Sequence, residues 1–307
     1  MIVVTGASGL LGVSVLTLAR SLGCEVVGIC HRHLIRVPGT RICRADLTDH
    51  KAVRSLFSSL QPESIIHCAA ATGVDWCEDH PALAEQVNVQ ASSFLAEIAQ
   101  ERNARFVYIS TDSVFDGKRG NYSETDQPDP VSVYAKSKLG GEQEVLRRHS
   151  SPLIVRVTIY GWNAQAKQSF AEWVLDEIAA GRQMLGFSDV YFCPLLANDL
   201  ADLLLAMLDR GLGGIYHVVS SERISKYEFA QRVAAIFNLG ADRVAPMSIR
   251  TANLRASRPA DPSLNTDKIC AALGRAMPDI DTGLRRFREL HESGYRNQLK
   301  SFLVGPC

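Results

Sequence analysis

Residues 1–12 read MIVVTGASGLLG, a short apolar run that leads into three glycines spaced three residues apart. Apolar residues then recur at helical spacing over 11–21, and a second apolar run follows at 25–30. This order of strand, glycine turn, helix and strand is the first unit of a parallel α/β sheet. Glycines in such a turn let a phosphate approach the free N–H groups of the helix, so a dinucleotide site is predicted. The residues expected to line it are Gly6, Ser8, Gly9, Leu10, Leu11 and Gly12.

The alternation of apolar strands and helices continues along the chain. Helices are expected at 49–60, 81–102 and 132–149, and strands at 64–68, 105–110 and 153–157. Beyond these, helices are expected at 168–180, 198–209 and 225–237, a strand at 214–219 and a loop at 245–262. The pattern predicts an α/β fold, a Rossmann-type doubly wound parallel sheet with a smaller α/β C-terminal substrate lobe. We place the dinucleotide-binding domain at 1–157 and the mainly substrate-binding lobe at 158–307, with a soft boundary that segments can cross.

The composition narrows the class of protein. The 307 residues are 46% apolar and 21% charged, with a formal net charge of zero. These values fit a folded chain with a large core, and they favour small-molecule or protein partners over nucleic acid. The sequence shows neither a signal peptide nor a run of about 18 apolar residues that could span a membrane, so a cytoplasmic protein is expected. The scattered cysteines and histidines lack metal-ligand spacing, which predicts reduced thiols and no metal.

The end of the second predicted strand indicates which cofactor is preferred. An NAD site usually carries an acidic residue there, which accepts from the ribose 2′-hydroxyl. This chain has His31, Arg32 and His33 instead. The planar cation of Arg32 suits a 2′-phosphate, so NADP is predicted, with NADPH favoured over NADH. Asp46 and Leu47, after the next short strand, are expected to bracket the adenine, with Asp46 accepting from its amino group.

Tyr134 and Lys138 lie four residues apart and therefore share one face of the helix predicted at 132–149. A phenol with a pKa of about 10 is a poor acid or base near pH 7 unless a fixed positive charge stabilises its phenolate. Lys138 can supply that charge. Thr111 and Asp112 follow the strand at 105–110, so all four side chains reach the carboxyl edge of the sheet, where open α/β folds bind ligands. A catalytic site is predicted at this edge.

Four segments together resemble the extended short-chain dehydrogenase/reductase superfamily and, within it, the dTDP-4-dehydrorhamnose reductase family. They are TGASGLLG at 5–12, HCAAATGVDWCE at 67–78, STDSVFDG at 110–117 and VYAKSKLGGE at 133–142. The likeness continues through RVTIYG at 156–161 and SRPADPSLNTDK at 257–268. The same family includes the regulatory β subunit of methionine adenosyltransferase, which the chain also resembles, particularly in the basic residues at 31–33.

The resemblance implies an NADP(H)-dependent oxidoreductase that reduces the 4-keto group of a nucleotide-linked 6-deoxyhexose. Tyr134 would donate a proton to the keto oxygen, and Thr111 would hydrogen-bond the same oxygen. Lys138 would hold the nicotinamide ribose and lower the pKa of Tyr134, and Asp112 would orient the substrate or tune proton transfer. The implied cofactor contacts also include Cys68, Ala69, Ala70, Thr72 and Ile159, besides Tyr134 and Lys138. A homodimer is compatible with the resemblance.

Two departures from the family pattern leave alternatives open. Ser113 stands where the family usually has a tyrosine. The missing ring removes a wall of the sugar pocket and leaves the identity of the substrate open. Ser14 and Val15 offer no carboxylate for the metal that some relatives bind. A sugar-nucleotide epimerase and a cofactor-binding regulatory subunit therefore remain as alternatives. A 4,6-dehydratase is disfavoured because it needs an Asp-Glu pair where this chain has Asp112 and Ser113.

Several other polar or aromatic residues have weaker claims to a functional role. Packing or loop hydrogen bonds explain them at least as well as substrate contact does. These residues are Trp162, Asn163, Pro194, Arg258 and Asn265. His67 is expected to be a satisfied core histidine, and the acidic cluster Asp75, Glu78 and Asp79 is expected to cap a helix.

Overall fold

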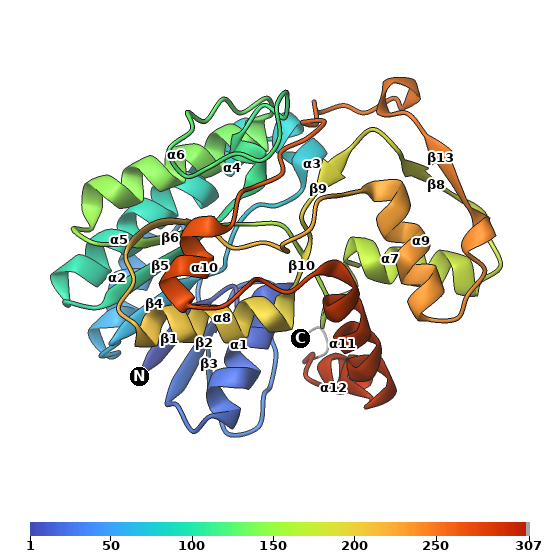
Figure 1. Ribbon diagram of the computed structural model, residues 1–307. Coiled ribbons are helices and arrows are strands. Elements are labelled where there is room, and N and C mark those ends of the chain that lie inside the picture. Colours follow the sequence, from blue (N-terminus) through green and yellow to red (C-terminus); the bar gives the residue numbers. More distant parts are fainter. Residues whose placement is uncertain (305–307) are drawn as a thin grey trace.

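A seven-stranded sheet forms the centre of the protein. The computed structural model describes residues 1–304 and has the strand order β11-β6-β5-β4-β1-β2-β3 (Figure 1). All neighbouring strands of this sheet are parallel. The strands are β1 (Ile2–Thr5), β2 (Val26–Cys30), β3 (Arg41–Arg44), β4 (Ser64–His67), β5 (Arg105–Thr111), β6 (Leu153–Val157) and β11 (Gly214–His217). The order reverses between β1 and β4, so the glycine turn after β1 lies at the switch point where such sheets bind ligands. The predicted Rossmann-type sheet is confirmed.

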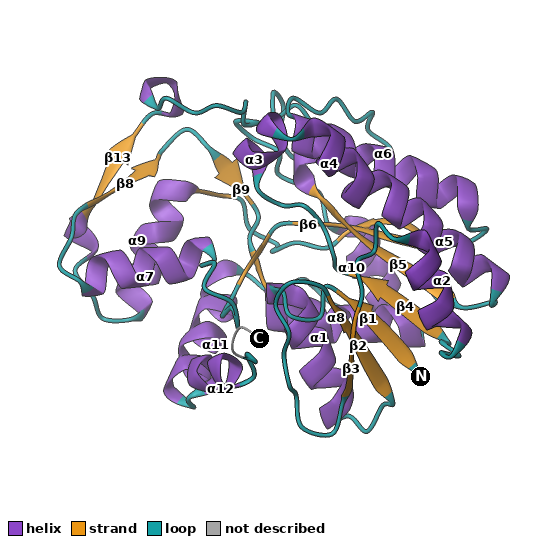
Figure 2. Cartoon of the chain, turned by 180° about the vertical axis from the view of Figure 1, so that it is seen from behind, coloured by secondary structure: helices purple, strands orange, loops and turns teal. Residues whose placement is uncertain are grey.

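Helices cover both faces of the sheet (Figure 2). On one face α1 (Leu10–Ser21) packs against α8 (Ala197–Asp209). The other face carries α2 (His50–Ser58), α5 (Ala91–Glu101) and α6 (Val133–Arg148). Side chains alternate along a strand, so neighbouring residues point to opposite faces of the sheet. Val4 lies in the hydrophobic core on one face and Val3 in the core on the other. Burial on both faces explains why β1 and β2 are almost wholly apolar.

The helix predicted at 81–102 is interrupted. It consists of α4 (Pro81–Glu85), a π-helical turn at Gln86–Gln90 and α5, and a short helix, α3 (Val74–Asp79), precedes it. Such π turns are rare and are frequent at functional sites. Here the turn holds Asn88, which is fully buried and whose side chain contacts the loop after β4. No helix of residues 1–304 combines the length and apolar character needed to cross a bilayer.

The second lobe lies beside the sheet and is built mainly of helices (Figure 1). Its helices are α7 (Phe170–Ala179), α9 (Lys226–Ile236), α11 (Ile280–Glu292) and α12 (Tyr295–Ser301). Its short strands pair as β7 (Ile159–Tyr160) with β10 (Leu195–Leu196), β8 (Met184–Phe187) with β13 (Val244–Met247), and β9 (Tyr191–Phe192) with β12 (Ile224–Ser225). Capping boxes begin α7 and α9, because Ser169 and Ser225 are each followed three residues later by a glutamate.

Two features of the second half differ from the simplest expectation. The region 245–262 is not all loop, because residues 244–247 form β13 although they include Pro246. Pro246 is tolerated because β13 pairs with one strand only and so forms an edge. In addition, α8 and β11 come from the second half of the sequence but belong to the central sheet and its helical layer, and α10 (Asp267–Leu273) packs against β11.

Helix α6 approaches the sheet closely at Gly141. A Cβ atom added there would collide with the hydroxyl of Tyr108 and the backbone oxygen of Asn88. The neighbouring Gly140 is different, because a Cβ atom there would meet only the side chain of Val89, at 3.1 Å. The absence of a side chain at Gly141 therefore sets the distance between α6 and the sheet. It thereby also positions the side chains that α6 carries.

These two glycines make a matched pair for a stability experiment. Replacing glycine by alanine inside a helix gains about 1 kcal/mol, so Gly140→Ala should leave the free energy of unfolding unchanged or slightly raised. Gly141→Ala should lower it by about 1–3 kcal/mol, because α6 must move away from Asn88. Urea unfolding of both variants measures the difference. Equal stabilities would contradict a close approach at Gly141.

Candidate active site

Tyr134 and Thr111 meet where α6 begins and β5 ends. Ser132 caps α6 by accepting from the N–H of Ala135 at 3.2 Å, and Glu78 accepts from the N–H of Val133 at 2.8 Å. These contacts hold Tyr134 in the first helical turn. Its side chain lies near that of Thr111, the last residue of β5. Helix α6 packs against β5, so Tyr134 and Thr111 both lie at the carboxyl edge of the sheet, and their catalytic role stays a prediction.

Asp112 is buried beside Thr111 and acts as a hydrogen-bond acceptor. Its Oδ1 accepts from the hydroxyls of Thr111 and Ser113, each at 3.1 Å, and its Oδ2 accepts from the hydroxyl of Thr158. Burial raises the pKa of Asp112, and these hydrogen bonds oppose the rise. The Thr111 hydroxyl thus donates to Asp112 while its oxygen accepts from the N–H of Ser113 at 3.2 Å. Thr111 must rotate its hydroxyl away from Asp112 before it can donate to a ligand.

Lys138 lies one turn further along α6 and is almost fully buried. Its Nζ lies 3.9 Å from the centroid of the Tyr108 ring, a cation–π contact. Burial lowers the pKa of Lys138 to about 7, and the negative charge of Glu142 opposes the change. Burial also raises the pKa of Tyr134 to about 12, and the nearby hydroxyl of Thr111 acts in the other direction. The expectation that Lys138 lowers the pKa of Tyr134 stays a prediction, and desolvation of the phenol acts against it.

The glycine turn has the shape of a phosphate cradle. Gly6 has a φ of +63°, and a Cβ atom added to it would lie 2.6 Å from the backbone nitrogen of Ala69. Gly9 is the N-cap of α1 and provides no capping side chain, so the first N–H groups of α1 stay available to an anion. Gly12 lets α1 pack directly on the carbonyl of Gly6. The six residues predicted here lie together, and their backbone fits a pyrophosphate.

Asn88 and His67 hold the loop after β4 against this turn. The amide of Asn88 accepts from the N–H of Ala71 at 2.8 Å and donates to its carbonyl at 3.1 Å, and it also donates to Ser137 of α6 at 2.9 Å. His67 lies between the hydroxyls of Thr5, at 2.6 Å, and Ser92, at 3.0 Å. Burial lowers the pKa of His67 to about 3, which keeps it neutral. The interpretation of His67 as a satisfied core histidine is confirmed.

The remaining predicted cofactor residues line the same edge of the sheet. Cys68 and Ala69 begin the loop after β4, and burial raises the pKa of the Cys68 thiol to about 12. Thr72 accepts from the ammonium of Lys167 at 2.7 Å. Ala70 and Ile159 are half-buried, with Ile159 on β7. The seven described cysteines are all free thiols.

The basic segment after β2 is exposed and next to Asp46. His31, Arg32 and His33 are all exposed, and His31 lies 3.6 Å from a carboxylate oxygen of Asp46. The other oxygen of Asp46 accepts from the N–H and hydroxyl of Thr48. Within residues 1–304 no carboxylate forms an ion pair with Arg32, so its guanidinium is available to a phosphate. No group of three or more metal-binding side chains lies together in the described chain.

The weaker candidates separate into packing and loop residues. Trp162 is in the core, stacked on Phe287 at 4.1 Å, and Pro194 and Asn163 are buried. Asn265 accepts from the N–H of Asp267. Arg258 pairs with Asp75 at 3.0 Å, so Asp75 binds a distant segment rather than capping its own helix. Only Glu78 of the acidic cluster caps a helix, and the helix is α6.

Sequence reasoning missed three side chains that the second lobe brings to the site. Gln165 donates to the carbonyl and hydroxyl of Ser8, at 3.0 and 3.2 Å, and Lys167 donates to Thr72. Lys226, the first residue of α9, lies close enough to Asp112 that each favours the charged form of the other. The capping-box pattern predicts where α9 begins, but only the packing of the lobes places Lys226 near Asp112.

Comparison with known proteins identifies the family. The family model for the RmlD substrate binding domain matches residues 1–292. The chain belongs to this family. The probable low-salt glycan biosynthesis reductase Agl14 of Haloferax volcanii is 33% identical over 288 residues, which cover 92% of this chain and 95% of that protein. Methionine adenosyltransferase 2 subunit beta of Danio rerio is 33% identical over 279 residues, which cover 87% and 83%.

A solved structure in the same family matches the whole fold. The dTDP-4-dehydrorhamnose reductase of Bacillus anthracis, crystallised in complex with NADP, superposes with a TM-score of 0.84 at 28% identity and covers 94% of this chain and 98% of its own. Membership in the RmlD family confirms the resemblance seen in the four sequence segments. The chain is equally identical, at 33%, to a probable reductase and to a methionine adenosyltransferase 2 subunit beta, so the function must be argued from the site.

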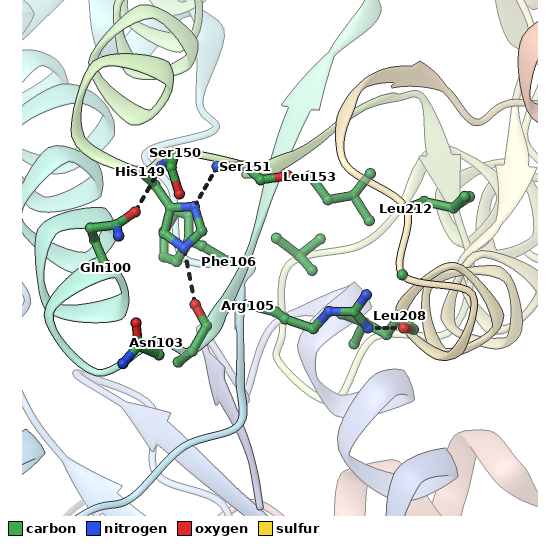
Figure 3. A pocket seen from close by; sticks show the side chains of 13 residues that line it. Gln100, Asn103, Arg105, Phe106, His149, Ser150, Ser151, Leu153, Leu208 and Leu212 are labelled. Carbon is green, nitrogen blue, oxygen red and sulfur yellow. Dashed lines mark hydrogen bonds between the residues drawn. The ribbon is translucent and has the colours of Figure 1, made fainter.

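A cavity lies at the opposite edge of the sheet and does not belong to this site. It has a volume of about 320 Å³ and lies between the ends of α5 and α8 (Figure 3). His149 accepts from the N–H of Ser151 at 3.2 Å and contacts the carbonyl of Ala104 at 3.0 Å, so both ring nitrogens are satisfied. Arg105 donates to the carbonyl of Leu208. These side chains support the chain turns around them.

The burial of Lys138 predicts a pH-dependent stability. Its pKa is about 7 in the folded protein and about 10.5 in an unfolded chain, so between these values the unfolded chain binds more protons and stability rises with pH. Lys138→Met should therefore be more stable than wild type below pH 7. Above pH 7 this advantage should shrink by up to about 1.4 kcal/mol per pH unit.

Urea unfolding at about pH 6.5 and about pH 9.5 measures the effect. Lys268→Met, which removes an exposed lysine of α10, is the control and should show no such trend. A stability advantage of Lys138→Met that is the same at both pH values would contradict a buried, destabilised charge.

Proposed function

We propose that the protein reduces the 4-keto group of a nucleotide-linked 6-deoxyhexose with NADPH. The observation that carries this proposal is the contact between Tyr134 and Thr111, with Lys138 one turn away, beside a phosphate cradle at the switch point of the sheet. The cofactor would supply the hydride. A phenol and a hydroxyl that can both reach one oxygen provide the proton and the polarisation that carbonyl reduction also needs.

The proposal gives each residue a separate task. Tyr134 donates its proton to the keto oxygen, and its neutral state, favoured by burial, is the state that this step requires. Thr111 positions the same oxygen after turning its hydroxyl away from Asp112. Lys138 binds the nicotinamide ribose, and its ammonium stabilises the phenolate left behind. Asp112 holds the Thr111 hydroxyl through the hydrogen bond at 3.1 Å until the substrate oxygen replaces it as acceptor.

The remaining parts of the site would hold the cofactor. The glycine turn and the first N–H groups of α1 would bind the pyrophosphate. Arg32 would bind the 2′-phosphate, and Asp46 and Leu47 would flank the adenine. The loop at 68–72 is held in place by Asn88, and small residues there would let the backbone approach the ribose.

A regulatory subunit is the second candidate, and the relationship to methionine adenosyltransferase 2 subunit beta supports it. Ser113 also leaves the sugar pocket without its usual aromatic wall. Such a protein would bind NADP, reduce no keto sugar, and co-purify with a methionine adenosyltransferase. A sugar-nucleotide epimerase would instead form product without net consumption of NADPH.

Tyr134→Phe tests the assigned acid. The variant keeps the ring and loses the proton, so NADPH oxidation with dTDP-4-dehydrorhamnose should fall by about 10²-fold or more. NADPH binding, followed by nicotinamide fluorescence, should stay within about twofold of wild type, which shows that the fold is intact. Normal turnover by the variant would refute the role of Tyr134.

Arg32→Ala tests cofactor selection. Removing a charge-assisted contact to the 2′-phosphate should weaken NADPH binding by about tenfold to a hundredfold and leave NADH binding unchanged. Arg243→Ala, which removes an exposed cation in the second lobe, is the matched control and should change neither. An equal loss for both cofactors would mean that Arg32 does not recognise the phosphate.

A further inference from the structure

The segment between β7 and α7, residues 163–168, is held at both ends. Trp162, just before it, is in the hydrophobic core, and Ser169, just after it, is the buried N-cap of α7. Its last three residues, 166–168, are exposed. We call residues 163–168 the strap. Because both ends are fixed in buried positions, any movement of the strap is confined to these residues.

The strap makes hydrogen bonds to both sides of the proposed cofactor site. On one side, Nε2 of Gln165 donates to the carbonyl and hydroxyl oxygens of Ser8, at 3.0 and 3.2 Å. On the other side, the ammonium of Lys167 donates to the hydroxyl of Thr72 at 2.7 Å. Ser8 belongs to the glycine turn after β1 and Thr72 to the loop after β4, and the strand order reverses between these two strands. The strap therefore spans the place where a dinucleotide lays its diphosphate.

The hydrogen bonds of the strap leave the phosphate-binding groups of the glycine turn free. Gln165 donates to oxygen atoms of Ser8, whereas an anion at the start of α1 needs backbone N–H groups. Lys167 likewise bonds to a hydroxyl oxygen and to no N–H group. The strap and a diphosphate therefore use different atoms of the same segments. The strap can stay in place while a dinucleotide is bound.

Helix α12 also holds the strap. The ammonium of Lys300 donates to the backbone carbonyl of Gln165 at 2.7 Å, and it forms no hydrogen bond with either side of the cofactor site in the described chain. Just beyond α12, Leu303 pairs with Ile35 in an isolated antiparallel bridge, directly after the basic residues at 31–33. The C-terminal helix thus supports both the strap and the segment proposed to bind the 2′-phosphate.

We propose that the strap closes over bound NADP and slows its release, with Gln165 and Lys167 as its two latches and Lys300 as a positioning residue. This inference rests on the cofactor site of the proposed function, but not on the reduction of any sugar. A strap that is bonded to both sides of the site must release at least one side before the dinucleotide can leave. Loss of a latch should therefore speed dissociation and change association less.

Release of NADPH tests the inference without any turnover. Protein loaded with NADPH would be mixed with excess NADP in a stopped-flow instrument, and the loss of nicotinamide fluorescence gives the dissociation rate. Wild type would be compared with Gln165→Ala, Lys167→Met and Lys300→Met. Gln168→Ala is the matched control for the first variant, because Gln168 lies in the strap but donates to a carboxylate of α7. Lys268→Met, at an exposed lysine of α10, is the control for the other two.

Each of Gln165→Ala, Lys167→Met and Lys300→Met should speed release by about threefold to thirtyfold, because each removes hydrogen bonds that hold the strap. The association rate should change by less than about threefold. Both controls should keep the wild-type rates. Adenosine 2′-monophosphate carries the adenine end of NADP and no diphosphate, so its affinity should be the same in every variant. This comparison separates an effect of the strap from damage to the whole cofactor site.

Wild-type release rates in Gln165→Ala and Lys167→Met would overturn the inference. Slower release or tighter binding in these variants would also overturn it, because the strap would then block NADP instead of retaining it. An equal loss of affinity for adenosine 2′-monophosphate would do the same. Failure of the proposed function gives a different result. A protein whose strap variants release NADPH faster, but which oxidises no NADPH with any keto sugar, would refute the reductase and leave the strap standing.

Discussion

An ion pair between Glu142 and Arg156 lies beneath the catalytic residues and fixes their geometry. Both side chains are about 2% exposed, and the guanidinium donates to the two carboxylate oxygens at 3.0 and 2.7 Å. The pair joins α6 to β6, and Ser110 of β5 donates to the same carboxylate. Removing one member of such a pair costs about 3–5 kcal/mol, because a buried charge is left alone. Helix α6 therefore cannot rotate or slide without breaking these contacts.

The negative charge of Glu142 also affects the protonation of Lys138. Glu142 lies one helical turn beyond Lys138, and its carboxylate favours the protonated form of that lysine against the effect of burial. Arg156 extends the network to His217 on β11, which contacts the carbonyl of Tyr122. The site thus depends on three neighbouring strands and one helix. The second lobe then adds Lys226 and Gln165 from elements that belong to no part of the sheet.

Local patterns in the sequence predict the alternating strands and helices of the central sheet. The glycine turn and the apolar strands around it follow from backbone and burial requirements, and the predicted sheet agrees with the structure. The π turn at Asn88 could not be predicted, because residues 81–102 carry an uninterrupted helical pattern. The strand at 244–247 was missed because it is four residues long and contains Pro246. Ser132 positions Tyr134 through a local cap, but Glu78 does so from a segment far away in the sequence, which spacing alone does not reveal.

The pKa values could not be predicted from spacing either. The separation of four positions from Tyr134 to Lys138 suggests mutual stabilisation, but burial pushes both groups towards their neutral forms. Reduction with NADPH carrying two deuterium atoms at C4 of the nicotinamide is the most direct test of the central claim. We predict that one deuterium enters C4 of the sugar of dTDP-4-dehydrorhamnose for each NADPH consumed, as measured by mass spectrometry and NMR. A product without deuterium, or no product, would contradict the account.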